Sequence, residues 1–271
     1  MALGGTKVYV GLDALAATAV ELVEGLAGRR ARELAETPLE PGALGPSPSG
    51  PNILRAEEVR EAVRRTLAGI DGRRVTLVLP DGVARLALLD LPAGAAPRDY
   101  VRFRLAASLP WPAADAIVET LPTGHGRAVG AAVRRATVAE YEQAATTAGL
   151  EVERVHLAPL LALEGLMRSG ARDAVHAVVG DVALCLAPFR GGLPVALRSR
   201  RRDRSPGEAG RLLEEARRAA DAAGDGTRPL RLVVSGREAG RMGREIGEGF
   251  ADRGLARLEG TEASWVGGLL S

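Results

Sequence analysis

Several residue types are scarce in this 271-residue chain, and each scarcity excludes a class of site. Its one cysteine, Cys185, excludes an internal disulfide and any metal site built from several thiolates, and favours a buried apolar role. The only lysine, Lys7, lies too near the start to complete a glycine-rich phosphate loop of the Walker type. The apolar runs have the length of strands, well short of the roughly 20 residues that cross a bilayer.

The charges are numerous but balanced. There are 36 basic and 34 acidic residues, so the net charge of +2 gives no indication of nucleic-acid binding. The first residues lack a basic start followed by an apolar stretch, and we therefore expect a cytoplasmic protein without a secretory signal. With 46% apolar residues, the length is sufficient for one large core or two modest ones.

One order of elements occurs in both halves of the chain. In the first half, alternating apolar residues predict strands over 7–12, 17–24 and 29–36, then a helix over 55–70 and a strand over 74–79. In the second half, strands are predicted over 174–179, 182–188 and 193–198, a helix over 205–223, a strand over 230–234 and a helix over 238–250. Capping boxes, Ser205 with Glu208 and Ser235 with Glu238, predict where these helices begin.

A different α+β unit separates the two halves. We predict strands over 85–91, 116–121, 127–134 and 151–157, and helices over 98–109 and 138–148, the second with the capping box Thr137 and Glu140. A helix over 159–167 then returns the chain to the first half. The predicted domains are a first lobe over 1–82 completed by 157–170, an inserted unit over 83–156 and a second lobe over 171–262. Trp265, in 263–271, either completes the first lobe or contacts a neighbouring molecule.

This duplicated plan resembles the actin-like superfold, an α/β fold in which two ribonuclease-H-like lobes face a nucleotide cleft. The stretches VGLDALAATAVELVEG, RFRLAASLPWPAADAIVETLP and AGLEVERVHLAPLLALEGL are similar to the PilM family, the cytoplasmic actin-like proteins of type IV pilus assembly. They are more distantly similar to the cytoplasmic domain of the type II secretion protein GspL. The resemblance implies an inserted α+β subdomain in the first lobe, and in the second lobe it indicates that the subdomain that covers adenine is missing.

The resemblance also implies an ATP site between the lobes. Gly11, Leu12 and Asp13 match its first motif, and the three candidate binding positions are Asp13, Gly180 and Gly236. Other residues around them do not match. Leu15 replaces a glycine that lets the backbone approach phosphate, and Val178 stands where a metal-orienting aspartate belongs. We interpret the three positions as remnants and expect no cofactor, no metal and no catalytic residue. Two alternatives stay open, namely that ATP with magnesium still binds and that Asp13 only accepts backbone N–H groups at a strand end.

Other charged or titratable residues give weaker indications. His125, His156 and His176 lack the spacing of metal ligands. The arginine-rich run over 198–204 predicts a solvated loop, with an acidic partner or anionic lipid headgroups as the alternatives. Aromatic residues that would stack on bases are not interleaved with it, so nucleic acid is not expected as a partner.

These observations favour a non-catalytic cytoplasmic scaffold of a type IV pilus or type II secretion platform, held at the inner membrane through its partners. The resemblance implies that the tail of a PilN-like membrane protein binds a groove between the first lobe and the inserted unit. The residues nearest to it by position are Pro80, Asp81, Val83, Arg85 and Leu88, which otherwise form a simple turn. The alternatives are an ATP-binding assembly switch and, from another class, a small-molecule kinase, for which Asp13 is the only suitably placed acid.

Overall fold

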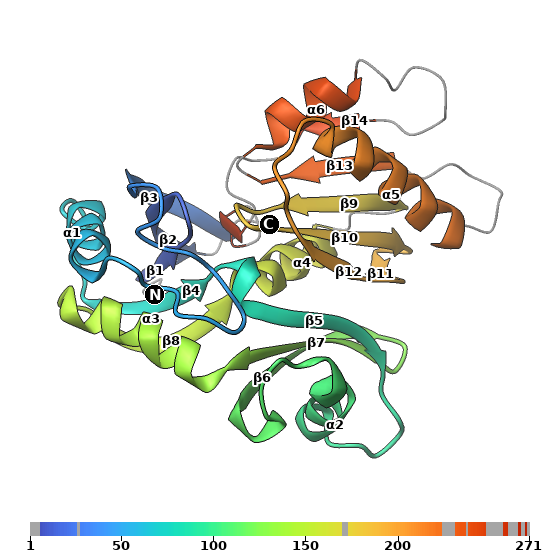
Figure 1. Ribbon diagram of the computed structural model, residues 1–271, viewed down its shortest axis with the longest axis horizontal. Helices are drawn as coiled ribbons and strands as arrows, with labels where there is room; N and C mark the ends of the chain where they lie inside the picture. Colours follow the sequence, from blue (N-terminus) through green and yellow to red (C-terminus); the bar gives the residue numbers. More distant parts are fainter. Residues whose placement is uncertain are drawn as a thin grey trace.

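Two α/β lobes and a smaller three-stranded unit make up the molecule (Figure 1). The structure is a computed structural model, and it describes residues 6–25, 28–169, 173–223, 231–236, 238–247, 257–259, 265, 266 and 269. Within these ranges, none of the helices combines the length and the apolar character that a membrane crossing requires.

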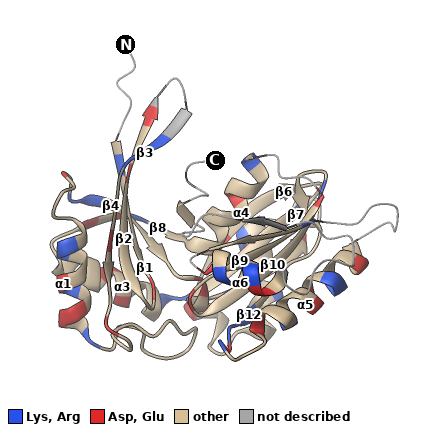
Figure 2. Cartoon of the chain, turned by 90° about the horizontal axis from the view of Figure 1, so that it is seen from above, with Lys and Arg blue, Asp and Glu red and all other residues tan. Residues whose placement is uncertain are grey.

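The first lobe is built on a five-stranded sheet in the order β3-β2-β1-β4-β8. The hairpin strands β1 (Thr6–Leu12), β2 (Ala16–Gly25) and β3 (Gly28–Pro38) are antiparallel, whereas β4 (Arg74–Leu79) and β8 (Glu151–Leu157) run parallel to β1. Helices α1 (Ala56–Thr66) and α3 (Arg135–Thr147) cover the outer face, as Figure 2 shows, and α4 (Ala158–Arg168) follows β8.

Alternation along β1 explains the two faces of this sheet. Val8, Val10 and Leu12 point to the core shared with α1 and α3, while Tyr9 packs on the opposite face. There the C-terminal residues Trp265, Val266 and Leu269 form a cluster with Val20, Val78 and Leu161. The end of the chain therefore packs against the first lobe, one of the two alternatives predicted for Trp265.

The second lobe repeats the plan on a six-stranded sheet. Strands β9 (Ala174–Val179), β10 (Ala183–Arg190), β13 (Arg231–Ser235) and β14 (Arg257–Glu259) are accompanied by helices α5 (Glu208–Ala223) and α6 (Ala239–Gly247). The strand predicted over 193–198 is divided into β11 (Leu193–Pro194) and β12 (Arg198–Arg201), both paired with β10. Pro194 has no N–H to donate, which weakens continued pairing at this point. The predicted helix end at Phe250 lies outside the described residues.

The third sheet has the order β5-β7-β6, from β5 (Ala84–Asp90), β6 (Ala116–Gly124) and β7 (Arg127–Arg134). Helix α2 (Pro97–Leu105) packs against it, and Val101 and Leu105 join the apolar side chains of β6 and β7. Short 3-10 turns, η1 (Asp81–Val83), η2 (Ala106–Ser108) and η3 (Ala113–Asp115), connect these elements. Strand β5 is an edge strand of this sheet.

Part of the segment predicted as the inserted unit belongs to the first sheet. Strand β8 pairs in parallel with β4 along its whole length, and Val138 and Tyr141 of α3 are buried in the same core as α1. The prediction that 83–156 forms one separate unit is therefore corrected for residues 135–156. The sequence pattern identifies each element here, but a parallel pairing between residues 77 or 78 positions apart has no local signal.

The three predicted capping boxes are wrong because each glutamate has a tertiary partner. Glu140 accepts the backbone N–H groups of Asn52 and Ile53 at 2.8 and 2.6 Å. Glu208 and Glu238 both accept from Arg202, and α5 and α6 begin at Glu208 and Ala239. Each helix nevertheless lies close to its predicted position.

Candidate functional site

The ends of strands from both lobes meet around a small cavity. Its lining comes from the turn after β1, the end of β4, the turn between β9 and β10 and the start of α4, with Trp265 as one wall. The open volume is about 50 Å³. Sites for cofactors and drug-sized ligands usually span roughly 300–1,000 Å³, so this cavity is smaller than such sites as the lobes stand.

Asp13 is occupied by its own turn. Its Oδ1 atom accepts the backbone N–H groups of Leu15 and Ala16 at 3.0 and 2.9 Å. A phosphate wrapped by this turn would need those N–H groups to point at the phosphate oxygens. Asp13 therefore accepts backbone N–H groups at the end of the strand, as one of the two alternatives requires.

Gly180 and Gly236 are explained by packing within the chain. A Cβ atom at Gly180 would overlap the carboxylate of Asp81, and one at Gly236, where φ is +114°, would overlap the carbonyl oxygen of Val179. Close backbone approach is therefore a structural need at both positions. Across the same interface, a Cβ at Gly82 of the first lobe would overlap the side chain of Val182 in the second.

Asp81 is the titratable group most changed by this packing. Burial, and secondarily the charge of Asp13, raise the pKa of Asp81 from 3.8 to about 7. Burial and the charge of Asp81 also raise the pKa of the Cys185 thiol to about 12. Cys185 therefore stays a protonated thiol at neutral pH, as its predicted buried role requires.

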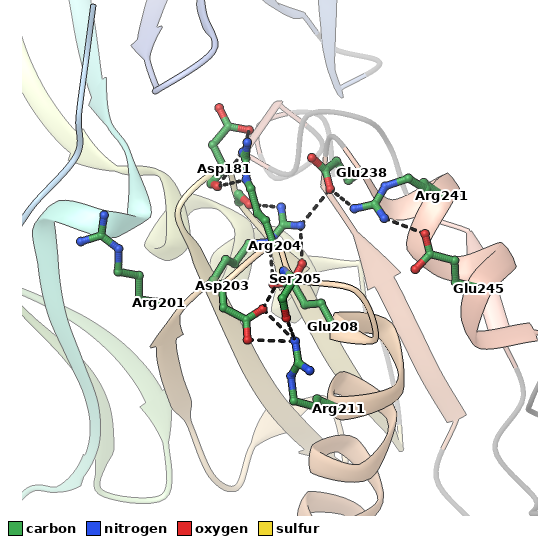
Figure 3. A network of polar contacts seen from close by, with 12 residues as sticks. Asp181, Arg201, Asp203, Arg204, Ser205, Glu208, Arg211, Glu238, Arg241 and Glu245 are labelled. Atoms are coloured by element: carbon green, nitrogen blue, oxygen red, sulfur yellow. Dashed lines mark hydrogen bonds and ion pairs between the residues drawn. The ribbon is translucent and has the colours of Figure 1, made fainter. Parts of the chain in front are cut away.

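Arg202 is the centre of a buried ion-pair network beside the cavity, and Figure 3 shows its partners Glu208 and Glu238. Its guanidinium donates to Glu208 at 3.1 and 2.8 Å, to Glu238 at 2.8 Å and to the carbonyl of Gly180 at 2.8 Å. Burial opposes ionisation of Glu238, but hydrogen bonds from Arg202 and Arg241 lower the pKa of that carboxyl to about 2. The network therefore holds the turn between β9 and β10 in place. The resemblance to the actin-like fold implies that this turn faces a nucleotide phosphate.

The predicted solvated loop over 198–204 is instead strand β12 followed by a paired segment. Arg204 donates from Nε and Nη2 to the carbonyl of Asp181 at 3.1 and 2.7 Å, and Arg200 donates to both carboxylate oxygens of Glu215 at 3.0 Å. Charge runs predict solvent exposure only when no acids come near. Here Glu208 and Glu215 of α5 pair with arginines of the run, and the run alone does not show that these acids lie beside it.

The five residues predicted to contact a partner are placed very differently. Val83 is fully buried in the core, and Pro80 and Asp81 are buried at the interlobe cavity, so their side chains are not accessible to a partner. Leu88 is half-buried against the core of the first lobe. Only Arg85 is exposed, and it lines a separate groove beside β12.

The three histidines lie on separate elements, in the turn after β6, in β8 and in β9. His176 is buried edge-on against Phe189, and burial lowers its pKa to about 4. His156 contacts Glu119 at 3.2 Å, and His125 lies in a turn with φ of 51°. The described residues contain no group of three or more histidine, cysteine or acidic side chains that could hold a metal ion.

Solved structures resemble this architecture over nearly the whole chain. A PilM–PilN type IV pilus biogenesis complex is 18% identical, covers 96% of this chain and 89% of its own, and gives a TM-score of 0.68. A Bacteroides thetaiotaomicron protein with an actin-like ATPase fold and unknown function is 9% identical, covers 99% and 96%, and gives 0.65. The chain has the actin-like fold.

A third similar structure comes from a secretion system. The cytoplasmic domain of EpsL, an inner-membrane component of the Vibrio cholerae type II secretion system, is 15% identical, with coverages of 85% and 82% and a TM-score of 0.53. The predicted fold and the predicted resemblance to these two kinds of protein are thus confirmed. No protein-family model and no curated protein matches the sequence.

Proposed function

We propose that this actin-like chain is a non-catalytic docking scaffold of a type IV pilus or type II secretion platform. In this proposal it binds the cytoplasmic tail of a PilN-like inner-membrane protein, and it reaches the membrane from the cytoplasm only through such partners. The likeness to the PilM–PilN complex and to the cytoplasmic domain of EpsL supports the assignment to a pilus or secretion platform. The main support for a non-catalytic role is the small volume of the interlobe cavity, about 50 Å³.

The groups at this cavity argue against ATP turnover. Phosphoryl transfer depends on donors and metal-bound oxygens that are positioned around the phosphates. Here the N–H groups of Leu15 and Ala16 bind Asp13, and the carbonyl of Gly180 binds Arg202. The functional interpretation is a pseudo-ATPase whose former site now stabilises the contact between lobes.

An ATP-binding assembly switch is the second candidate. It is favoured by Asp13, Asp81 and Asp181, which reach the cavity from both lobes and are the kind of side chain that orients hydrated magnesium. This candidate requires the lobes to separate before nucleotide can enter.

Binding of the partner's tail separates the two candidates. A fluorescent synthetic peptide of the cytoplasmic N-terminal tail of the membrane protein encoded beside this chain would be titrated with the full chain, with and without MgATP. We expect the same affinity in both conditions. Binding only with MgATP would favour the switch, and no binding in either condition would contradict the scaffold.

A further inference from the structure

A second, larger cavity lies where the first lobe, the inserted sheet and the second lobe meet. We call it the β5–β12 groove; it is lined by residues of the ranges 46–49, 81–86, 182–183 and 199–201, and its volume is about 300 Å³. This volume is at the lower end of the range of ligand sites, which is roughly 300–1,000 Å³. Strand β12 lies against β5 here and covers this edge of the inserted sheet, so the space suits a small solute and not an added strand.

Two arginines line the groove from different parts of the chain. Arg85 belongs to β5 and Arg201 to β12, both are exposed, and neither guanidinium has an ion pair or hydrogen bond with any described residue. Figure 3 shows Arg201 apart from the ion-pair network, with its side chain extending toward the first lobe. A guanidinium presents two parallel N–H groups whose geometry matches the oxygens of a phosphate.

Little negative charge in the groove opposes an anion. Asp81 is the only acidic residue among the described residues that line it, and its carboxylate lies against Gly180, toward the interlobe cavity. Burial raises the pKa of Asp81 to about 7, so this carboxyl is ionised in only part of the molecules at neutral pH. Arg200 also lines the groove but is paired with Glu215, so the uncompensated positive charge is that of the other two arginines.

The rest of the lining combines hydroxyl groups with apolar side chains. The hydroxyls of Ser49 and Ser199 make no hydrogen bond with the described residues and can donate to an anionic oxygen. Pro48, Leu86 and Val182 supply carbon surface in the same groove. A ligand with a phosphate at one end and a small organic group at the other would contact both kinds of surface.

The rim of the groove is held in place before any ligand arrives. Asn52, which is fully buried, accepts the N–H of Ser47 at 2.8 Å and donates to the carbonyls of Ser47 and Gly50 at 3.2 and 2.9 Å. Glu140 in turn accepts the backbone N–H of Asn52 at 2.8 Å. A preformed rim lowers the ordering cost that binding would otherwise carry.

We infer that the β5–β12 groove binds a small phosphate ester, with the phosphate between the guanidiniums of Arg85 and Arg201 and the organic group against the apolar lining. A phosphate monoester carries a charge of about −1.5 to −2 at neutral pH, which two unpaired arginines can neutralise. One arginine comes from the inserted sheet and the other from the second lobe, so a bound phosphate also holds these two parts together. The site goes beyond the proposed scaffold role and requires neither the membrane partner nor the interlobe cavity.

Isothermal titration of the full chain with glycerol 3-phosphate, at constant ionic strength, tests this site. We expect one saturable site with a dissociation constant of about 1 mM or tighter. Arg85→Gln and Arg201→Gln should each weaken the affinity by about tenfold or more, because each removes charge-assisted hydrogen bonds to the phosphate. Arg198→Gln is the matched control, since Arg198 is an exposed arginine of β12 that does not line the groove, and it should change the affinity less than about twofold.

Thermal unfolding gives a second readout on the same proteins. Because the three arginines are exposed, we expect the unfolding midpoints without ligand to agree, which establishes that the variants are folded. Added glycerol 3-phosphate should raise the midpoint of the parent chain and of Arg198→Gln, and should raise that of Arg201→Gln much less, because a ligand stabilises only the fold that binds it.

Several outcomes would overturn the assignment. These are the absence of saturable binding, equal affinity in the parent chain, Arg85→Gln and Arg201→Gln, or an equal loss in Arg198→Gln, which would indicate diffuse attraction to positive charge. Inorganic phosphate that binds more tightly than the ester would show that the apolar lining contributes nothing and would overturn the assignment to an ester. Arginine-dependent binding to vesicles of phosphatidic acid without binding of the soluble ester would assign the site to a lipid headgroup instead. The titration with the partner's tail is a separate experiment, so a failure of this site and a failure of the scaffold are distinguishable.

Discussion

Arg202 is a buried arginine beside the interlobe contact, and two carboxylates pair with it. Its side chain is 1% exposed, and its guanidinium donates hydrogen bonds to Glu208, Glu238 and the carbonyl of Gly180. Removing one member of a buried ion pair leaves the other charges unpaired in a medium that solvates them poorly, at a cost of about 3–5 kcal/mol.

We therefore predict that Arg202→Ala lowers the free energy of unfolding by about 3–5 kcal/mol, as measured by urea denaturation. Arg211→Ala is the control, because the pair of Arg211 with Asp203 is exposed and should contribute little. Equal losses in the two variants would show that Arg202 does not have the central role assigned to it.

Asp81 gives the lobe contact a pH dependence. An unfolded aspartate ionises near pH 4 and folded Asp81 at about 7, so between these values the folded state binds more protons than the unfolded state. The contribution of Asp81 to stability is fully favourable below about pH 4 and is lost as the pH rises through 7. His176, with a pKa of about 4, acts in the opposite direction between pH 6.5 and 4, so the chain must be compared with a variant.

Asp81→Asn removes this titration while keeping the shape of the side chain. We predict that, relative to the parent chain, its unfolding midpoint rises between pH 5 and pH 8, because the parent chain loses stability as Asp81 ionises. The measurement is thermal unfolding of both proteins across that range. A constant difference between them would mean that Asp81 ionises normally in the folded state.

At the scale of elements, the sequence predicted most helices and strands to within a few residues. Strands such as β4 and β9 consist of short apolar runs with no competing pattern, so their limits are given by the residues alone. The misjudged features depend on distant partners. Glu140 is 88 residues from the backbone N–H of Asn52 that it accepts, and Arg202 is 36 residues from Glu238.

The candidate site was predicted less completely than the fold. Motif comparison found Asp13, Gly180 and Gly236, and it indicated that their surroundings are altered. It does not indicate that Arg202 binds the carbonyl of Gly180 or that Trp265 packs over Gly11. Packing between elements decides which side chains fill a cleft, and the motifs contain no information about it. Val83 is buried and Arg85, two residues later, is exposed, because Val83 ends the 3-10 turn η1 and Arg85 lies in the edge strand β5, a boundary that the sequence does not reveal.

Helix α3 fixes the loop after β3 through Glu140. We predict that Glu140→Ala destabilises the chain by about 2 kcal/mol and speeds proteolysis within residues 41–54, because two charge-assisted hydrogen bonds to Asn52 and Ile53 are lost. Glu142→Ala, on the same helix, removes a carboxylate that makes no hydrogen bond with the described residues. If both variants were cleaved at the same rate, Glu140 would not be the anchor of the loop.

At the scale of the whole molecule, one closed contact links the two lobes and the end of the chain. Gly82 meets Val182 across the lobes, Asp81 meets Gly180, and Trp265 packs over Gly11. Together these contacts leave a cavity of about 50 Å³ at the position of the nucleotide cleft in the actin-like plan. This closure separates the two proposed functions, because a scaffold needs no entry for a nucleotide and a switch does.

Isothermal titration of the full chain with MgATP tests the closure most directly. If the lobes stay closed, we expect no saturable heat up to millimolar nucleotide, which corresponds to a binding free energy weaker than about −4 kcal/mol. Saturable binding tighter than millimolar, lost in Asp13→Asn, would contradict this closure.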